Sequence, residues 1–150
     1  MNHRLALPLF LVFVVGGGLA IGYVTAPGAW YAQLAKPAFT PPGRIFGPVW
    51  TVLYVLIAVA GWRVWRRDRG GWPMRLWWVQ LGLNFLWSPV FFSAHRIGLA
   101  LAVVLLLLGA ILAFIFTAWA RDRVAAWVFA PYAAWVAFAA ALNASILALN

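Results

Sequence analysis

The sequence predicts an all-α integral membrane protein built as a five-transmembrane-helix bundle. The chain of 150 residues is 67% hydrophobic and only 9% charged, whereas soluble domains are about one quarter charged. Its long apolar runs approach the ~20 residues that a helix needs to cross the hydrocarbon core. The cores of these runs contain no Asp, Glu, Lys or Arg, and they fill nearly the whole chain, so we expect a single membrane domain, residues 1–150. The predicted helices span roughly residues 5–26, 45–65, 74–94, 97–120 and 124–149, with a loop at 27–44.

The first helix, 5–26, has the basic start and apolar stretch that are also typical of a secretory signal peptide. Cleavage after Ala26 would leave Pro27 next to the cut, and the apolar stretch is long enough to span the membrane. We therefore expect the helix to be retained. Its Gly18 and Gly22 form a small-xxx-small pair of the kind that allows close helix contacts, either within the chain or across a dimer.

The loop 27–44 is the only long connection. It is rich in proline and aromatic residues ("WYAQLAKPAFTPP"), so its backbone is restricted. The connections between the third, fourth and fifth helices are very short, which predicts that these helices are antiparallel neighbours. The fifth helix is rich in alanine, whose small side chain favours tight packing and leaves space where a flat ligand could lie.

The net charge of +9 is distributed unevenly. If the helices alternate in direction, eight arginines fall on one side of the membrane and only Lys36, Arg44 and Arg96 on the other. This bias follows the positive-inside rule and, for an inner membrane, predicts a cytoplasmic N-terminus and an external C-terminus. Topology and contact with anionic lipid explain the basic residues, so nucleic acid is not expected as a partner. The Ala- and Arg-rich composition is typical of bacteria.

Several classes of chemistry lack the residues that they need. There is no cysteine for a disulfide or an iron–sulfur site. No carboxylate lies inside a predicted helix, so a proton- or cation-coupled carrier would lack its coupling group. We expect Asp68 and Asp122 to lie solvated in arginine-flanked turns, and His95 to lie at a membrane edge. No nucleophile–base pair, phosphate-binding loop or metal-binding cluster is present, so we expect no metal and no obligatory cofactor.

Polar residues follow one face of the third helix. Gln80, Asn84 and Ser88 are four residues apart and have aromatic residues beside them. They either hydrogen-bond between helices as packing contacts or form part of a pocket wall that mixes aromatic surface with a few polar groups. Trp135 lies near the middle of the fifth helix, far from the membrane surfaces where tryptophan is common. An indole at that depth needs a partner for its N–H.

Three segments resemble signature sequences of the translocator protein family, whose members are also called tryptophan-rich sensory proteins or peripheral-type benzodiazepine receptors. The segments are "WYAQLAKPAFTPPGRIFGPVWTVLY", "QLGLNFLWSPVFF" and "PYAAWVAFAAALN". The resemblance implies a five-helix bundle, commonly a homodimer, that binds porphyrins such as protoporphyrin IX and haem, isoquinoline-carboxamide-type ligands and sterols. It also implies that the long first loop covers the ligand as a lid.

The resemblance assigns roles to individual residues. It places Trp50 and Trp135 in contact with ligand, and in some bacterial relatives both are implicated in light-dependent porphyrin breakdown. Asn84 matches the asparagine of the family's "LNxxW" stretch, Tyr31 the tyrosine of "WY", and Ala139 a small pocket residue. The expected ligand-binding residues are Tyr31, Trp50, Tyr54, Gln80, Asn84, Trp87, Phe91, Trp135 and Ala139, and the expected lid residues are Trp30, Pro37, Phe39, Pro41 and Pro42.

Two positions depart from the family pattern. Ala38 stands where some relatives have tryptophan, and the C-terminal "LNASILALN" lacks the tyrosine and basic residue of the animal cholesterol motif.

The first hypothesis is a tetrapyrrole-binding membrane protein that acts as sensor, scavenger or transporter, with sterols as a secondary ligand class. The alternatives are light-dependent oxidation of porphyrin, with Trp50 or Trp135 as candidate catalytic residues, and a structural or partner-binding bundle.

Overall fold

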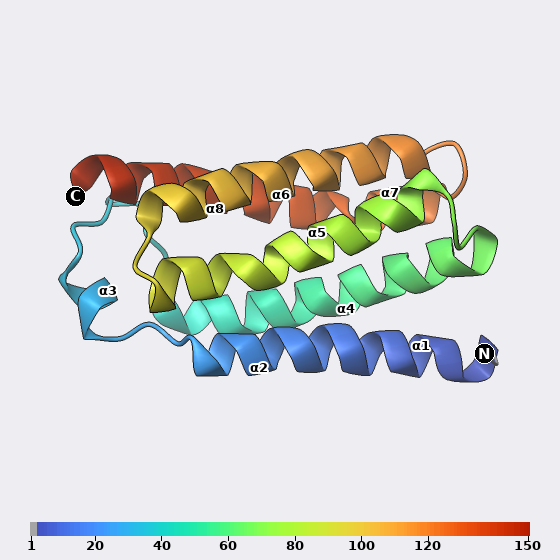
Figure 1. Ribbon diagram of the computed structural model, residues 1–150, viewed down its shortest axis with the longest axis horizontal. Coiled ribbons are helices and arrows are strands. Elements are labelled where there is room, and N and C mark those ends of the chain that lie inside the picture. The colour runs from blue at the N-terminus through green and yellow to red at the C-terminus, as the bar shows by residue number, and fades with distance from the viewer. Residues whose placement is uncertain (1–2) are drawn as a thin grey trace.

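The computed structural model describes residues 3–150, and these form helices, turns and loops without any β-strand. The long helices run side by side in an elongated bundle (Figure 1), with the start of α1 at one end and the short helix α3 at the other. The end of α8 also lies at the α3 end. The elements are α1 (His3–Leu11), the π-helical turn η1 (Val12–Gly16), α2 (Gly17–Val24), α3 (Ala29–Gln33), α4 (Gly43–Arg67), α5 (Trp72–Ser88), the π-helical turn η2 (Pro89–Ser93), α6 (Ile97–Ala118), α7 (Arg123–Val128) and α8 (Ala130–Leu149).

Four segments within residues 3–150 are long and apolar enough to cross a membrane: Arg4–Val24, Gly43–Arg67, Ile97–Ala118 and Arg123–Leu149. They confirm the predicted class of all-α membrane protein. The third predicted helix differs from the others, because α5 has 17 residues, fewer than the ~20 of a typical span, and continues only as the turn η2. The exact count of five spans therefore stays a prediction.

Proline explains two places where the observed helices differ from the predicted ones. Pro89 has no N–H to donate to the carbonyl four residues earlier. The helix changes there from α to π, and the Ala94 N–H instead donates to the Pro89 oxygen at 2.9 Å. The predicted fifth helix is interrupted at Phe129, because Pro131 favours the first turn of a new helix.

Two further boundaries differ from the prediction. The loop predicted at 27–44 is partly helical, since it contains α3, and it ends two residues earlier because α4 begins at Gly43. At its other end α4 continues to Arg67 rather than residue 65. Its last turn carries arginines, which interact favourably with the negative end of the helix dipole.

Close contacts between glycine and aromatic rings bring the helices together. Gly61 of α4 lies so near the indole of Trp77 from α5 that a Cβ would overlap the ring. Trp77 is fully buried and donates its Nε1–H to the Ile57 oxygen at 2.9 Å. Gly18 of α2 lies equally close to the Tyr54 ring. The predicted small-residue position Gly18 therefore packs inside the chain.

At the end of the bundle away from α3, Asp122 connects α4 with the start of α7. Its carboxylate accepts hydrogen bonds from Arg63 at 3.0 and 3.1 Å, from Arg67 at 3.1 Å and from the Ala125 N–H at 3.2 Å. Burial opposes ionisation, but the bonds from Arg63 and Ala125 and the charges of both arginines hold the pKa of Asp122 below its usual value. The expectation of a solvated Asp122 was wrong, because the residue is only 5% exposed.

We expect Gly61→Ala to destabilise the bundle by about 1–3 kcal/mol, because the added methyl group overlaps the Trp77 ring in a tightly packed interior. Gly82→Ala in α5 is the matched control. A Cβ at Gly82 has no neighbour within 4 Å, and alanine favours a helix over glycine by up to about 1 kcal/mol. Thermal unfolding in detergent, followed by circular dichroism, measures both variants. Equal stability of Gly61→Ala and the native protein would contradict the close contact.

Titration of Asp122 should also be visible in stability. Because its folded-state pKa is lowered from the ordinary value of 3.8, its contribution is present above about pH 4 and is lost as the pH falls through the lowered pKa. We expect Asp122→Asn to cost about 1–3 kcal/mol at neutral pH and to flatten the loss of stability in acid. Asp68→Asn is the control, because its 2.7 Å pair with Arg121 is exposed and contributes little. Thermal unfolding midpoints measured across this pH range test the prediction. Equal effects of Asp122→Asn and Asp68→Asn would refute the stabilising role assigned to Asp122.

Candidate functional site

A cavity of about 660 Å³ lies within the bundle at the α3 end, among α2, α4, α5, α6 and α8. This volume is in the range of small-molecule sites, about 300–1,000 Å³. Of the residues predicted to contact a ligand, the cavity wall includes Tyr31, Trp50, Tyr54, Asn84, Trp87, Phe91, Trp135 and Ala139. Gln80 does not line the cavity.

Aromatic side chains form much of the cavity wall. On α4, the rings of Trp50 and Tyr54 lie 5.5 Å apart. Phe46, also on α4, packs edge-on against Trp135 of α8, with ring centroids 5.8 Å apart. Trp87 stacks on a neighbouring ring of η2 as well, so flat apolar surfaces come from α4, α5 and α8. Such surfaces suit a large planar ligand, which can bury both of its faces against them.

The indole N–H groups of the cavity differ in their partners. Trp87 donates its Nε1–H to Asn143 Oδ1 at 3.1 Å. The Nε1–H of Trp135 is buried and has no hydrogen-bond partner. A buried donor without a partner costs about 1–3 kcal/mol, and this donor belongs to a residue that lines the cavity. Trp135 thus contributes to the cavity wall, while its indole N–H is buried and without a partner in the bundle.

A hydrogen-bond network behind the wall explains the position of Gln80. The fully buried Tyr132 donates its hydroxyl to Gln80 Oε1 at 2.7 Å and accepts from Asn84 Nδ2 at 2.7 Å. Asn84 Oδ1 in turn accepts from the Tyr54 hydroxyl at 3.5 Å. Gln80 thus hydrogen-bonds between helices, which is one of the two interpretations of the polar face. Asn84 combines both, because it belongs to the network and also lines the cavity.

The third residue of this polar face lies at the cavity rim. Ser88 Oγ is 2.5 Å from Thr25 Oγ1, a hydrogen bond that joins the start of the loop after α2 to α5. Thr25 is itself buried and donates back to the Ile21 oxygen. Both residues line the cavity, so this hydrogen bond joins two parts of its wall.

Aromatic contacts hold the loop 27–44, which we call the lid loop, against the helices. Trp30 stacks on His95 with ring centroids 4.1 Å apart. Tyr31 packs edge-on against Phe92 at 5.3 Å, and Phe39 against a ring of α8 at 6.0 Å. Among the predicted lid residues, Pro41 lines the cavity, whereas Trp30, Pro37, Phe39 and Pro42 do not.

The lid loop is also tied to the end of α8. Asn150 accepts from the Ala35 N–H at 3.1 Å and donates to the Ala35 oxygen at 2.9 Å. This two-point contact joins residues 115 positions apart in the chain. The loop is thus held against η2 and α8 by its aromatic residues and at the end of α8 by Asn150.

Sequence reasoning missed a cation at the cavity. Lys36 lines the cavity, where its Nζ lies 4.4 Å from the centre of the Tyr31 ring and donates to the Leu34 oxygen at 3.3 Å. Burial raises the pKa of the Tyr31 hydroxyl, which therefore stays neutral beside this cation. Thr40, Phe46, Phe138 and Asn143 are further lining residues outside the predicted set. The only available signal was their place in the resembling segments.

The chemistry of the cavity is that of binding. Its lining residues supply aromatic rings, amides, hydroxyls and a lysine. In the part of the chain that the structure describes, no three His, Cys, Asp or Glu residues come together as a metal site. The arrangement favours a planar, largely apolar ligand that carries a hydrogen-bond acceptor and a negative group.

A model of the TspO/MBR family matches residues 9–149 of the chain. The protein belongs to this family. The chain is 35% identical over 152 residues to "Protein CrtK" of Rhodobacter capsulatus, with 97% of this chain and 95% of the relative covered. It is 35% identical over 150 residues to the "Tryptophan-rich sensory protein" of Cereibacter sphaeroides (100% and 95% covered). It is 39% identical over 120 residues to the "Translocator protein" of Homo sapiens (76% and 70% covered).

Membership of the TspO/MBR family confirms the resemblance of the three sequence segments. All three segments supply residues of the cavity wall. Trp50 and Tyr54 come from the first, Asn84 and Trp87 from the second, and Trp135 from the third. The family signatures of this chain thus meet at one cavity, although they are far apart in the sequence.

We expect Tyr132→Phe to destabilise this TspO/MBR protein by about 1–3 kcal/mol, because Gln80 and Asn84 lose a buried partner and cannot reach water. Tyr23→Phe is the matched control, since Tyr23 is 85% exposed. Thermal unfolding in one detergent compares the two variants. A Tyr132→Phe protein as stable as Tyr23→Phe would show that the network adds nothing to the fold.

Proposed function

We propose that this TspO/MBR protein binds a tetrapyrrole, protoporphyrin IX or haem, within the membrane and acts as a sensor, scavenger or transporter of it. The observation that carries the proposal is the aromatic cavity of about 660 Å³, whose wall includes both Trp50 and Trp135. The names of two relatives, "Tryptophan-rich sensory protein" and "Translocator protein", support a sensing or transport role.

The chemistry of a porphyrin agrees with the groups in the cavity. Its flat ring would bury apolar surface against Trp50 and Trp135, at about 25 cal/mol per Å² removed from water. Its carboxylates would lie towards Lys36, the cation of the lid loop that lines the cavity. His95 stacks on Trp30 and does not line the cavity, so the proposed affinity comes from the ring and its carboxylates and needs no iron ligand from this histidine.

A second candidate function is light-dependent oxidation of bound porphyrin by dissolved oxygen, with Trp50 or Trp135 as an electron or radical partner. The observation that favours it is that both indoles line the same cavity. A cavity of this kind also suits isoquinoline-carboxamide-type ligands, which present an acceptor oxygen. Sterols are a further candidate ligand class. A purely structural or partner-binding role is the remaining alternative.

The proposed place of the protein is a bacterial membrane. We propose that α5 and η2 together cross the membrane and complete a set of five spans. The loop after α4 and the loop after α6 then lie on the same side. The arginine-rich end would face the cytoplasm, with the N-terminus there and the cavity towards the other side. The bilayer is then a partner along the whole bundle, and a homodimer is the proposed assembly.

We expect the double variant Trp50→Phe, Trp135→Phe to bind protoporphyrin IX about tenfold more weakly, because it loses the indole N–H donors and part of the aromatic surface. The measurement is a titration of detergent-purified protein in the dark, followed by tryptophan fluorescence quenching. The matched control is Trp78→Phe, Trp127→Phe, which removes two exposed indoles that do not line the cavity. Equal affinities of both double variants would refute the assigned cavity.

Illumination of the same samples separates the candidate functions. Saturable quenching with a stable porphyrin absorption spectrum supports binding, sensing or transport. Bleaching that depends on light and disappears in the cavity variant supports porphyrin breakdown. Absence of any saturable binding would leave the structural role.

A further inference from the structure

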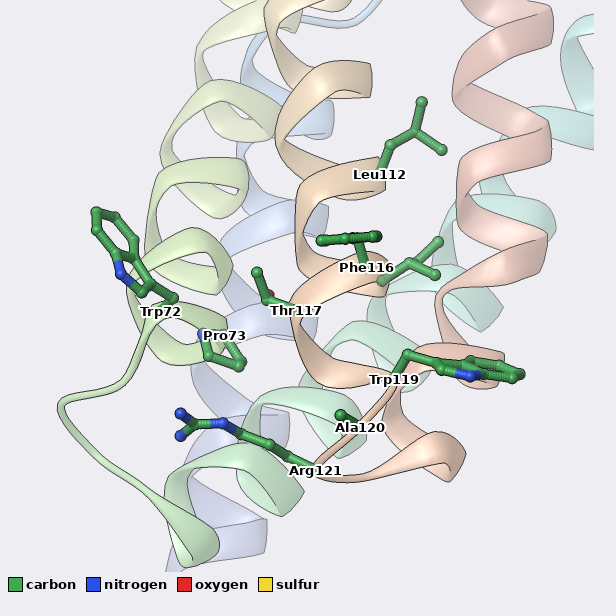
Figure 2. A pocket seen from close by; sticks show the side chains of 9 residues that line it. Trp72, Pro73, Leu112, Phe116, Thr117, Trp119, Ala120 and Arg121 are labelled. Carbon is green, nitrogen blue, oxygen red and sulfur yellow. The ribbon is translucent and has the colours of Figure 1, made fainter.

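A second hollow lies at the opposite end of the bundle, on its outer surface. It is an open groove of about 690 Å³ beside the last turns of α6 and the first turn of α5. Figure 2 shows Leu112, Phe116 and Trp119 along α6, with Trp72 of α5 on the other side and Arg121 below. These side chains are exposed, so in a membrane the groove faces lipid rather than another helix of the chain.

Both edges of the groove carry an arginine stacked over a tryptophan. The guanidinium of Arg75 lies 5.2 Å from the centre of the Trp72 ring. That of Arg123 lies 5.1 Å from the Trp119 ring. Stacking of this kind holds a cation beside an apolar surface without neutralising its charge. Tryptophan with arginine is also the usual combination at the level of lipid headgroups.

The charges around the groove are not balanced within the described chain. Asp122 is bound by Arg63 and Arg67, and Asp68 by Arg121. These are the two acidic residues of the protein, so Arg75 and Arg123 have no carboxylate partner. Arg121 uses one nitrogen for Asp68 at 2.7 Å, and a guanidinium has five N–H donors. An anion at the lower edge of the groove would therefore meet a free side of Arg121 between two uncompensated cations.

We propose that this groove is a binding site for an anionic phospholipid of the surrounding leaflet. An acyl chain lies in the groove against Leu112 and Phe116, and the phosphate lies at Arg121, flanked by Arg75 and Arg123. The apolar groove explains why the ligand has a chain, and the uncompensated arginines explain why its headgroup is anionic. The site is separate from the cavity under the lid loop and does not depend on what that cavity binds.

The test is native mass spectrometry of the full chain in detergent, titrated with phosphatidylglycerol and, separately, with phosphatidylcholine. We expect the native protein to retain phosphatidylglycerol preferentially and Arg75→Gln, Arg123→Gln to lose about fivefold or more of that preference. The matched control is Arg66→Gln, Arg69→Gln. It removes the same charge from two arginines that are also stacked over tryptophan rings, but away from the groove, and should change the preference by less than about twofold.

Further measurements keep the proposal falsifiable. Ala120→Trp fills the groove without changing charge and should also release the lipid. Inorganic phosphate should not compete, because it has no chain to place in the groove. Equal losses of phosphatidylglycerol preference in both arginine variants would mean that only the total positive charge attracts the lipid, and would overturn the site. Effective competition by phosphate would overturn it as well. A change in the monomer–dimer ratio of Ala120→Trp with unchanged lipid binding would make the groove a surface between two copies and overturn it too.

Discussion

Inside a membrane bundle, each polar group must find its partner within the protein, because the hydrocarbon offers none. The hydroxyl of Tyr132 meets this requirement for α5 and α8, since it bonds both Gln80 and Asn84. Asn143 does the same one level nearer the lid loop, where it accepts from Trp87 and donates to a backbone oxygen at the start of α6. These bonds fix how far the helices can slide or rotate, and so they fix which aromatic faces point into the cavity.

The same constraint gives meaning to the donors that lack a partner. Among the described side chains, three buried nitrogens have none: those of Trp62, Gln80 and Trp135. Trp62 belongs to the arginine-rich end, and the Gln80 amide already holds Tyr132 with its oxygen. Only Trp135 of these three lines the cavity. The depth of this tryptophan in α8 thus places it in the cavity wall, while its N–H stays buried without a partner.

Sequence reasoning succeeded for features that the residues of a single segment determine. Composition and apolar runs predicted the membrane class, and the predicted ligand-binding set contained eight of the residues that line the cavity. Gln80 was predicted to line the cavity because it lies on the same helix face as Asn84. That face borders both the cavity and α8, and only the packing of α8 decides which residue contacts which. The surroundings of Asp122 and Lys36 depend on residues far away in the chain. Their partners and positions follow from tertiary structure, which local patterns do not encode.

The interior between the two ends of the bundle bears on how a ligand would move. Below the cavity lie Trp77, Phe114 and Tyr132, all fully buried, and two of them are hydrogen-bonded in place. A path along the bundle axis would have to break these bonds and open the contact at Gly61. The lid loop is instead held by exposed contacts, such as those of Asn150 with Ala35. For the proposed ligand, exchange at the lid end would break exposed contacts, whereas passage through the core would break buried ones.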